Sequence, residues 1–374
     1  MPLPLVTISL QRPTIGHITG RVTHEDTKRT FTFESRDVNQ TLQSYADAIR
    51  VKIERYMAGM GNANDELRGA ANSGWLFLDS LFGKVWDAAT GRPDPTFKAE
   101  ILAWLSAKGG MVVVDSEYAH APWNFLYLSK PGASANVSDF LGARQLVLQR
   151  VNLSGGLPPV WPIRKLFAIH GKDVPMVAEM SQIESHANRT GTALQRFPKD
   201  MTTRVMHCQT EFDALWASSD PSVVHVASHL SPPPRSITGQ PGPDWSATIL
   251  VANDVCDEEL ELGDVLASVG SSRAAMELGF FNLCSLGKST LLLQGGVAAA
   301  FAVRLGCSIF VDMILHSDLA EKFAGAFYAA YLSGEDPIKA YDLAKQSVCV
   351  SDEETVRALC YRFTFGDHLL DMAA

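Results

Sequence analysis

Two mainly apolar segments of the sequence each lead directly into a side chain capable of nucleophilic chemistry. Residues 222–228 are followed by His229, and residues 277–283 are followed by Cys284. In a parallel sheet, two such strands would deliver both side chains to the carboxyl edge, where open α/β sheets keep their sites. A histidine beside a cysteine can activate the thiol as a nucleophile. The sequence therefore predicts a catalytic dyad of His229 and Cys284.

The order and the spacing of these two residues favour one class of cysteine enzyme. Cys284 follows His229 by 55 residues, and caspase-type peptidases place the histidine roughly 50 residues before the cysteine. Papain-like enzymes have the opposite order, with the cysteine first. The pattern therefore favours caspase-type chemistry, with Asn282 as a candidate for positioning the end of the cysteine's strand.

Two other kinds of site fit the same region less well. Residues 287–289, Gly-Lys-Ser, resemble the end of a phosphate-binding loop, but that motif needs a glycine where this chain has Asn282. His225 and His229 have the spacing of a zinc motif, yet in a strand they would lie about 13 Å apart. We predict no metal site and no cofactor. His225 shares a strand face with His229, and we interpret it as a core histidine, with a second ligand or an orienting group as alternatives.

The strands and helices that must position the dyad follow an N-terminal region with a different sequence pattern. Residues 1–36 alternate apolar and polar side chains, which predicts a small β-meander. Helical spacing follows over residues 38–60 and 66–89. A turn rich in glycine and proline at residues 91–95 then marks a boundary. We predict an accessory or regulatory region at residues 1–94.

Residues 95–374 alternate strand-like and helical patterns, which predicts an α/β domain with a mainly parallel sheet flanked by helices. Asp336 and Pro337 supply an N-cap and an N1 proline for a late helix. A long loop at residues 231–246, with five prolines, follows the candidate histidine and is either a surface insertion or a gating element. The expected strands lie at residues 110–115, 145–151, 164–169, 222–228, 247–252, 277–284 and 307–312.

Composition limits the partners and the compartment. With 374 residues, 46% of them hydrophobic, the chain can bury a large core plus a smaller appendage. A net charge of −9 disfavours direct binding to nucleic acid or to an anionic membrane. The six cysteines form no Cys-x-x-Cys pair, so we expect reduced thiols. The start of the sequence lacks a signal-peptide pattern, and we expect a cytoplasmic protein that does not enter a membrane.

Several ordered segments within residues 95–350 resemble the CHAT peptidases, a caspase-like family related more distantly to separase. Ala121–Leu126 looks like the family's Pro-Trp-Glu-Leu-Leu segment, and the strand at Phe140–Arg150 follows it. The remaining matches, in order, are the His229 strand, Asn282–Cys284, the helix at residues 294–305, the strand at residues 307–312, the helix near residues 319–332 and the helix that begins Ala340-Tyr341-Asp342. The chain departs from the family at Leu230, where glycine is usual, and at Leu283, where alanine is common.

The resemblance implies a cysteine endopeptidase that acts on a protein substrate. Cys284 would be the nucleophile and His229 its base, with backbone N–H groups at Leu230 and Cys284 stabilising the oxyanion. It also implies activation by a regulatory protein partner in bacterial antiviral defence or another pathway of regulated proteolysis. The alternative is a catalytically inactive caspase-like scaffold that binds a partner.

Relatives of the CHAT family also suggest a preference for a basic residue before the scissile bond. Asp312 and Asp318 stand where the acidic pocket for that residue would be built, after the strand that follows the cysteine. Asp318 has a second interpretation, because Asp318 with Glu321 forms a capping-box pattern at a helix start.

Overall fold

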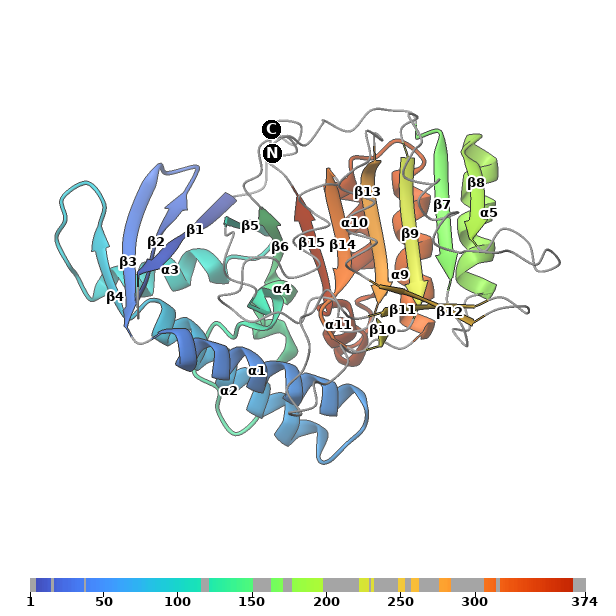
Figure 1. The fold of residues 1–374 in the computed structure, drawn as a ribbon. Coiled ribbons are helices and arrows are strands. Elements are labelled where there is room, and N and C mark those ends of the chain that lie inside the picture. Colours follow the sequence, from blue (N-terminus) through green and yellow to red (C-terminus); the bar gives the residue numbers. More distant parts are fainter. Residues whose placement is uncertain are drawn as a thin grey trace. The chain divides into compact units, whose positions relative to one another are not determined.

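A computed structural model describes most of the chain and divides it into two compact units (Figure 1). Unit 1 holds the described residues up to 150 together with 351–362, and unit 2 holds those from 163 to 350 together with 363–365. The described residues are 5–14, 17–36, 38–115, 121–150, 163–170, 177–197, 222–228, 230–231, 248–252, 257–261, 276–283, 306–313 and 317–365.

Unit 1 is built on a mixed sheet whose strands lie in the order β4-β3-β2-β1-β5-β6. The predicted β-meander is confirmed, because β1 (Leu5–Thr14), β2 (His17–His24) and β3 (Arg29–Arg36) pair antiparallel. On the other side β1 runs parallel to β5 (Gly110–Asp115), which in turn pairs with β6 (Gln145–Arg150). The boundary predicted near residue 94 therefore falls inside unit 1.

Alternation of side chains decides which face of the meander is buried. Ile8, Val22 and Phe31 share one face and are completely buried, whereas the intervening Thr7 and Thr23 are half-exposed. Helix α3 (Thr96–Ser106) covers the apolar face, since Phe97 and Trp104 stack on Phe31 at ring-centroid distances of 4.7 and 5.1 Å. The period-2 pattern thus determines the core of unit 1.

Two long helices, α1 (Val38–Met57) and α2 (Ala63–Leu81), complete the N-terminal part of unit 1. The buried Glu66 of α2 pairs with Lys52 and Arg55 of α1 at 2.8 and 3.1 Å. The helix predicted over residues 66–89 was too long, because α2 ends at Leu81 and the chain enters strand β4 (Lys84–Asp87). The reason is that alternation in β4 lets Val85 pack beside its register partner Phe33, an interaction that a helix would lose.

Late segments of the chain fold back into unit 1. Buried Asn124, within the 3₁₀ helix η1 (Trp123–Phe125), donates to the carbonyl oxygens of Leu359 and Tyr361 at 3.0 and 2.8 Å. Buried Arg362 donates to Gln149 of β6 at 3.0 Å. The other short elements here are η2 (Val137–Asp139), α4 (Leu141–Arg144) and α11 (Asp352–Ala358), and β15 (Tyr361–Phe365) begins in unit 1 and ends in unit 2.

Unit 2 contains a parallel sheet in the order β14-β13-β9-β7-β8, in which every described pairing is parallel. Its helices pack together, α5 against α9 and α9 against α10 (Figure 1). The α/β class with a mainly parallel sheet flanked by helices is confirmed. The bounds are β7 (Lys165–His170), α5 (Val177–Thr190), β8 (Ala193–Phe197), β9 (Ser222–Ser228), β13 (Met276–Leu283), β14 (Cys307–Val311), α9 (Ser317–Tyr331) and α10 (Pro337–Val348).

The start of α10 agrees with its sequence signals. Asp336 is the N-cap, its carboxylate accepts from the backbone N–H of Lys339 at 2.9 Å, and Pro337 is the first helical residue. This arrangement satisfies one N–H that the first turn cannot bond internally. The helix prediction from Asp336-Pro337 is therefore confirmed.

One expected strand belongs to a different sheet. Residues 248–252 form β11 (Thr248–Ala252), but it pairs antiparallel with β10 (Leu230–Ser231) and β12 (Asp257–Glu261). Placing β11 with the parallel strands was wrong, because its hydrogen-bonding edges are occupied by β10 and β12. Apart from Ser231, the proline-rich segment at residues 231–246 lies outside the described residues.

Candidate active site

The predicted dyad itself, His229 and Cys284, lies outside the described residues. The structure does describe the residues directly before each of them. Ser228 ends β9, Leu283 ends β13, and the two are register partners in adjacent parallel strands. The two strands that lead into the dyad residues therefore end at the same level of the sheet, at its carboxyl edge.

The same register shows which side chains lie on one face of the sheet. The positions two and four residues before His229 and Cys284 share this face. His225 is paired with Phe280, and Ala227 is paired with Asn282. Partners in a parallel ladder point to the same side of the sheet. Helices α5 and α9 cover that side, because Glu179 of α5 and Tyr328 of α9 both approach His225.

A polar cluster joins four elements on this face, and we call Glu179, His225, Asn282 and Tyr328 the Glu179 cluster; all but the half-buried Asn282 are buried. Asn282 Nδ2 donates to Glu179 Oε1 at 2.7 Å. His225 Nε2 lies 3.1 Å from the same oxygen, at an ion-pair distance but without the alignment of a hydrogen bond. His225 Nδ1 lies 3.1 Å from Tyr328 Oη. The sheet face beside the strand ends is thus held by polar contacts as well as by apolar packing.

Burial fixes the protonation of Tyr328 in the Glu179 cluster. Burial, and after it the negative charge of Glu179, raises the pKa of Tyr328 well above its usual value of 10.0. Tyr328 therefore keeps its hydroxyl proton at neutral pH, with its Oη atom 3.1 Å from Nδ1 of His225.

The interpretation of His225 as a core histidine is confirmed, since its side chain is 0% exposed and packs against the ring of Phe280 at 5.2 Å. Sequence reasoning missed Glu179. It lies in the first turn of α5, where a carboxylate is commonplace, and no local pattern connects it with Asn282, which is 103 residues away. The sequence holds one signal for this region: His225 and His229 are four residues apart, so in a strand both side chains lie on the same face.

The two aspartates predicted for a substrate pocket occupy different environments. Asp312 directly follows β14 and is 3% exposed. Because Phe281 is paired with Phe310, Asp312 stands level with Leu283 at the carboxyl edge. Asp318 is exposed and is the second residue of α9.

The capping-box interpretation of Asp318 and Glu321 was wrong. Helix α9 begins at Ser317, so Asp318 lies inside the first turn rather than at the N-cap. Glu321 instead accepts a hydrogen bond from Gln182 of α5 at 2.9 Å. Asp318 still interacts favourably with the positive end of the helix dipole, which explains an acidic residue at this position.

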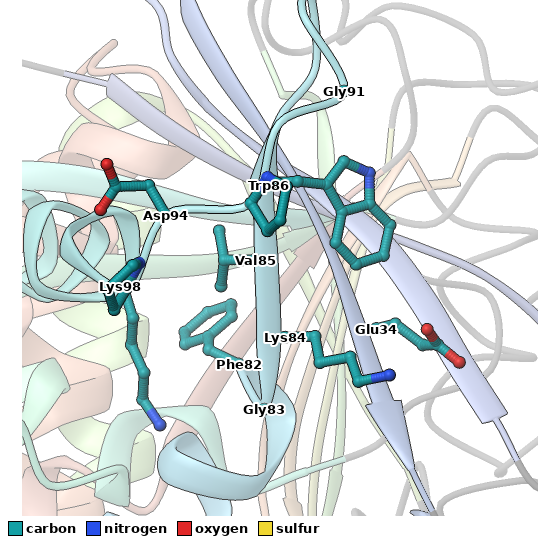
Figure 2. Close-up of a pocket in the computed structure, with 11 residues that line it drawn as sticks. Glu34, Phe82, Gly83, Lys84, Val85, Trp86, Gly91, Asp94 and Lys98 are labelled. Atoms are coloured by element: carbon teal, nitrogen blue, oxygen red, sulfur yellow. The ribbon is translucent and has the colours of Figure 1, made fainter.

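A cleft of about 740 Å³ lies in unit 1, beside β4 (Figure 2). Lys84 and Glu34 are register partners on one side of β4, and Figure 2 shows Val85 and Phe82 on the side of Lys98. The lining combines both signs of charge with aromatic rings and selects no single class of ligand. The described lining residues are Glu34, Phe82, Gly83, Lys84, Val85, Trp86, Gly91, Pro93, Asp94, Pro95 and Lys98.

In the described part of the chain, no group of three or more His, Cys, Asp and Glu side chains is arranged to hold a metal ion. Cys307, Cys349 and Cys360 form no disulfide within the described residues. Among the helices described, none combines the length and the apolar character needed to cross a membrane.

Comparison with known proteins leaves the family open. No protein-family model matches the chain, and no curated protein matches it. Among solved structures, the chain is similar to one described as "Structure of Protease", with a TM-score of 0.41 and 8% sequence identity. The alignment covers 72% of this chain and 68% of that chain. A likeness at this level assigns neither a family nor an activity.

Proposed function

We propose that the chain is a caspase-like cysteine endopeptidase of the CHAT type, with His229 and Cys284 as its dyad. The observation that supports this most directly is the pairing of Ser228 with Leu283. The next residue along each strand is the histidine or the cysteine. Continuation of the same parallel register by one residue would make His229 and Cys284 neighbours, on one side of the sheet and about 5 Å apart at the backbone.

The chemistry follows from that placement. His229 takes the thiol proton, the Cys284 sulfur attacks the scissile carbonyl carbon, and the protonated imidazole returns the proton to the leaving amine. Water then hydrolyses the thioester, and the acid product leaves with the thiol restored. Backbone N–H groups of Leu230 and Cys284 are the proposed oxyanion donors, each worth about 3 kcal/mol by comparison with a well-studied protease.

One observation favours the alternative of an inactive scaffold. Leu230 is the first residue of β10 and is paired with Ile249, in extended backbone. The glycine that the CHAT family usually has there can adopt a positive φ and turn its N–H toward a substrate oxygen. A scaffold would keep the fold and the strand register but would not need an ionised thiol.

The pH dependence of Cys284 alkylation separates the two functions without any knowledge of the substrate. Iodoacetamide is applied from pH 5 to 10, and the Cys284 peptide is quantified by mass spectrometry. In a working dyad the neighbouring imidazolium lowers the pKa of the thiol, so alkylation stays fast well below pH 7. His229→Ala should return the midpoint to about 8.5, the value of an ordinary cysteine. A wild-type midpoint near that of the variant would exclude the peptidase and leave the scaffold.

For specificity, we propose that Asp312 contributes to a pocket for a basic residue before the scissile bond. It is the better placed of the two predicted aspartates, because it is buried and level with the strand ends. Asp312→Asn should reduce cleavage after arginine and lysine at least about tenfold, since a desolvated charge-assisted contact is lost. The measurement is a peptide-library profile, with Asp318→Asn, at an exposed position of α9, as the matched control. Equal losses for both variants, or a preference for acidic residues in the wild type, would contradict this assignment.

We further propose that a protein partner activates the enzyme and that the site acts on a specific protein substrate in bacterial defence or regulated proteolysis. A peptidase without restraint would degrade the cell's own proteins. The small sheet of β10, β11 and β12 begins directly after His229 in the chain, which makes it a suitable element for a partner to contact. High turnover of unfolded protein by the purified chain alone would contradict this proposal.

A further inference from the structure

Glu179 contacts both strands that lead into the proposed dyad, although it belongs to neither. Its Oε1 atom accepts from Asn282 of β13 at 2.7 Å and lies 3.1 Å from Nε2 of His225 of β9. Asn282 is two residues before Cys284, and His225 is four residues before His229. One carboxylate oxygen therefore links the two strands close to the ends from which the dyad extends.

The position of this carboxylate is itself firmly held. Its side chain is 4% exposed, and it lies in the first turn of α5, where the helix dipole stabilises a negative charge. Helix α5 packs on α9, and Gln182 of α5 bonds Glu321 of α9 at 2.9 Å. A carboxylate on a packed helix can fix the spacing of two strands more rigidly than a contact from a loop.

The backbone ladder and apolar packing already hold β9 beside β13. The rings of Phe280 and His225 are in contact across this pair, and most of the neighbouring side chains are apolar and buried. Burying a carboxylate, an amide and an imidazole here costs desolvation energy that an apolar set would avoid. Polar groups contribute what apolar contacts lack, which is a defined direction and distance.

We propose that Glu179 is a positioning residue that fixes the separation between the ends of β9 and β13, and thereby the geometry of His229 and Cys284. Asn282 is its partner on the cysteine strand. The inference rests on the proposed function, since it assigns Glu179 a role in that same site. Glu179 contacts neither the substrate nor the reacting atoms in this scheme.

The test uses the full-length protein and the alkylation profile of Cys284 with iodoacetamide. Glu179→Ala removes the link between the strands and should raise the midpoint of the profile by at least about one pH unit, so that alkylation at pH 6.5 slows about tenfold. Glu179→Gln keeps an oxygen that can accept from Asn282 and should restore most of the wild-type rate. Gln182→Ala is the matched control, because it removes a side-chain hydrogen bond of the same helix that reaches α9 rather than a strand.

If Glu179→Ala does not fold, Asn282→Ala provides a second variant. Asn282 is only half-buried, and its loss removes only the hydrogen bond between Glu179 and β13, the strand that leads to Cys284. It should shift the midpoint in the same direction. A merely structural role predicts lower melting temperatures with an unchanged Cys284 profile in all variants, and that result would overturn the inference while the dyad stands. A wild-type profile with an ordinary midpoint would instead overturn the dyad, and the positioning role with it.

Discussion

Cys284→Ala should abolish cleavage of a protein substrate, with a loss of at least about 10³-fold, because no other group can form the thioester. His229→Ala should cause a loss of similar order, since the thiol then remains protonated at neutral pH. Both effects exceed any expected from a residue that only binds substrate. The measurement is mass-spectrometric detection of new termini in a digested proteome, with host lysate added as a source of activator.

The control for this prediction is stability. The melting temperatures of both variants should stay close to that of the wild type, because the strands preceding the two residues are held by the buried side chains of β9 and β13. Residual cleavage by Cys284→Ala at more than a few per cent of the wild-type rate would show that another nucleophile acts. Unfolding of both variants would assign His229 and Cys284 to the core instead.

Phe280→Ala should lower the free energy of unfolding by about 3–5 kcal/mol, the range for removing a large aromatic side chain from a core. Phe280 is completely buried on β13, and its ring lies 5.4 Å from Phe327 and 5.6 Å from Tyr328 of α9. Truncation leaves a cavity between the sheet and this helix. The measurement is the shift of the urea midpoint, interpreted with an unchanged slope.

Leu343→Ala, on α10 of the same unit, is the comparison for Phe280→Ala. Leu343 is 40% exposed, so its truncation should cost less than about 1 kcal/mol. A loss below 1 kcal/mol for Phe280→Ala as well would mean that the sheet and α9 are packed too loosely to form a cavity.

The strands that could be predicted from the sequence are those whose residues both favour the strand conformation and are buried in the fold. In β9, every residue from Ser222 to Ser228 is buried, and the segment is mostly apolar. The strands β8 and β12 were not predicted, because polar residues interrupt them: Gln195 and Arg196, and the acidic run Asp257–Glu259. Strand β15 was also missed, although its five residues alternate apolar and polar side chains. Their strand state depends on neighbours that are distant in sequence.

The candidate site also has features that the local sequence reveals and features that depend on the assembled fold. The chemical types of His229 and Cys284 and their place after apolar runs can be recognised locally, so the sequence identifies them as candidates. The pairing of Ser228 with Leu283 is a matter of register between segments 55 residues apart, which depends on the assembled sheet. Glu179 could not be predicted at all, because its role exists only once a helix and two strands have come together.

The return of the chain into unit 1 has a consequence for the protein during its synthesis. Asn124 donates to the carbonyl oxygens of Leu359 and Tyr361, and Cys360 packs its sulfur 3.5 Å from that of Met57. The ribosome must therefore translate more than 200 further residues before the N-terminal unit can bury these groups. Contacts of such long sequence separation form late and slowly. A nascent chain that stalls near residue 350 would expose an incomplete N-terminal unit to the cell's quality control, so truncated copies should be degraded before they accumulate.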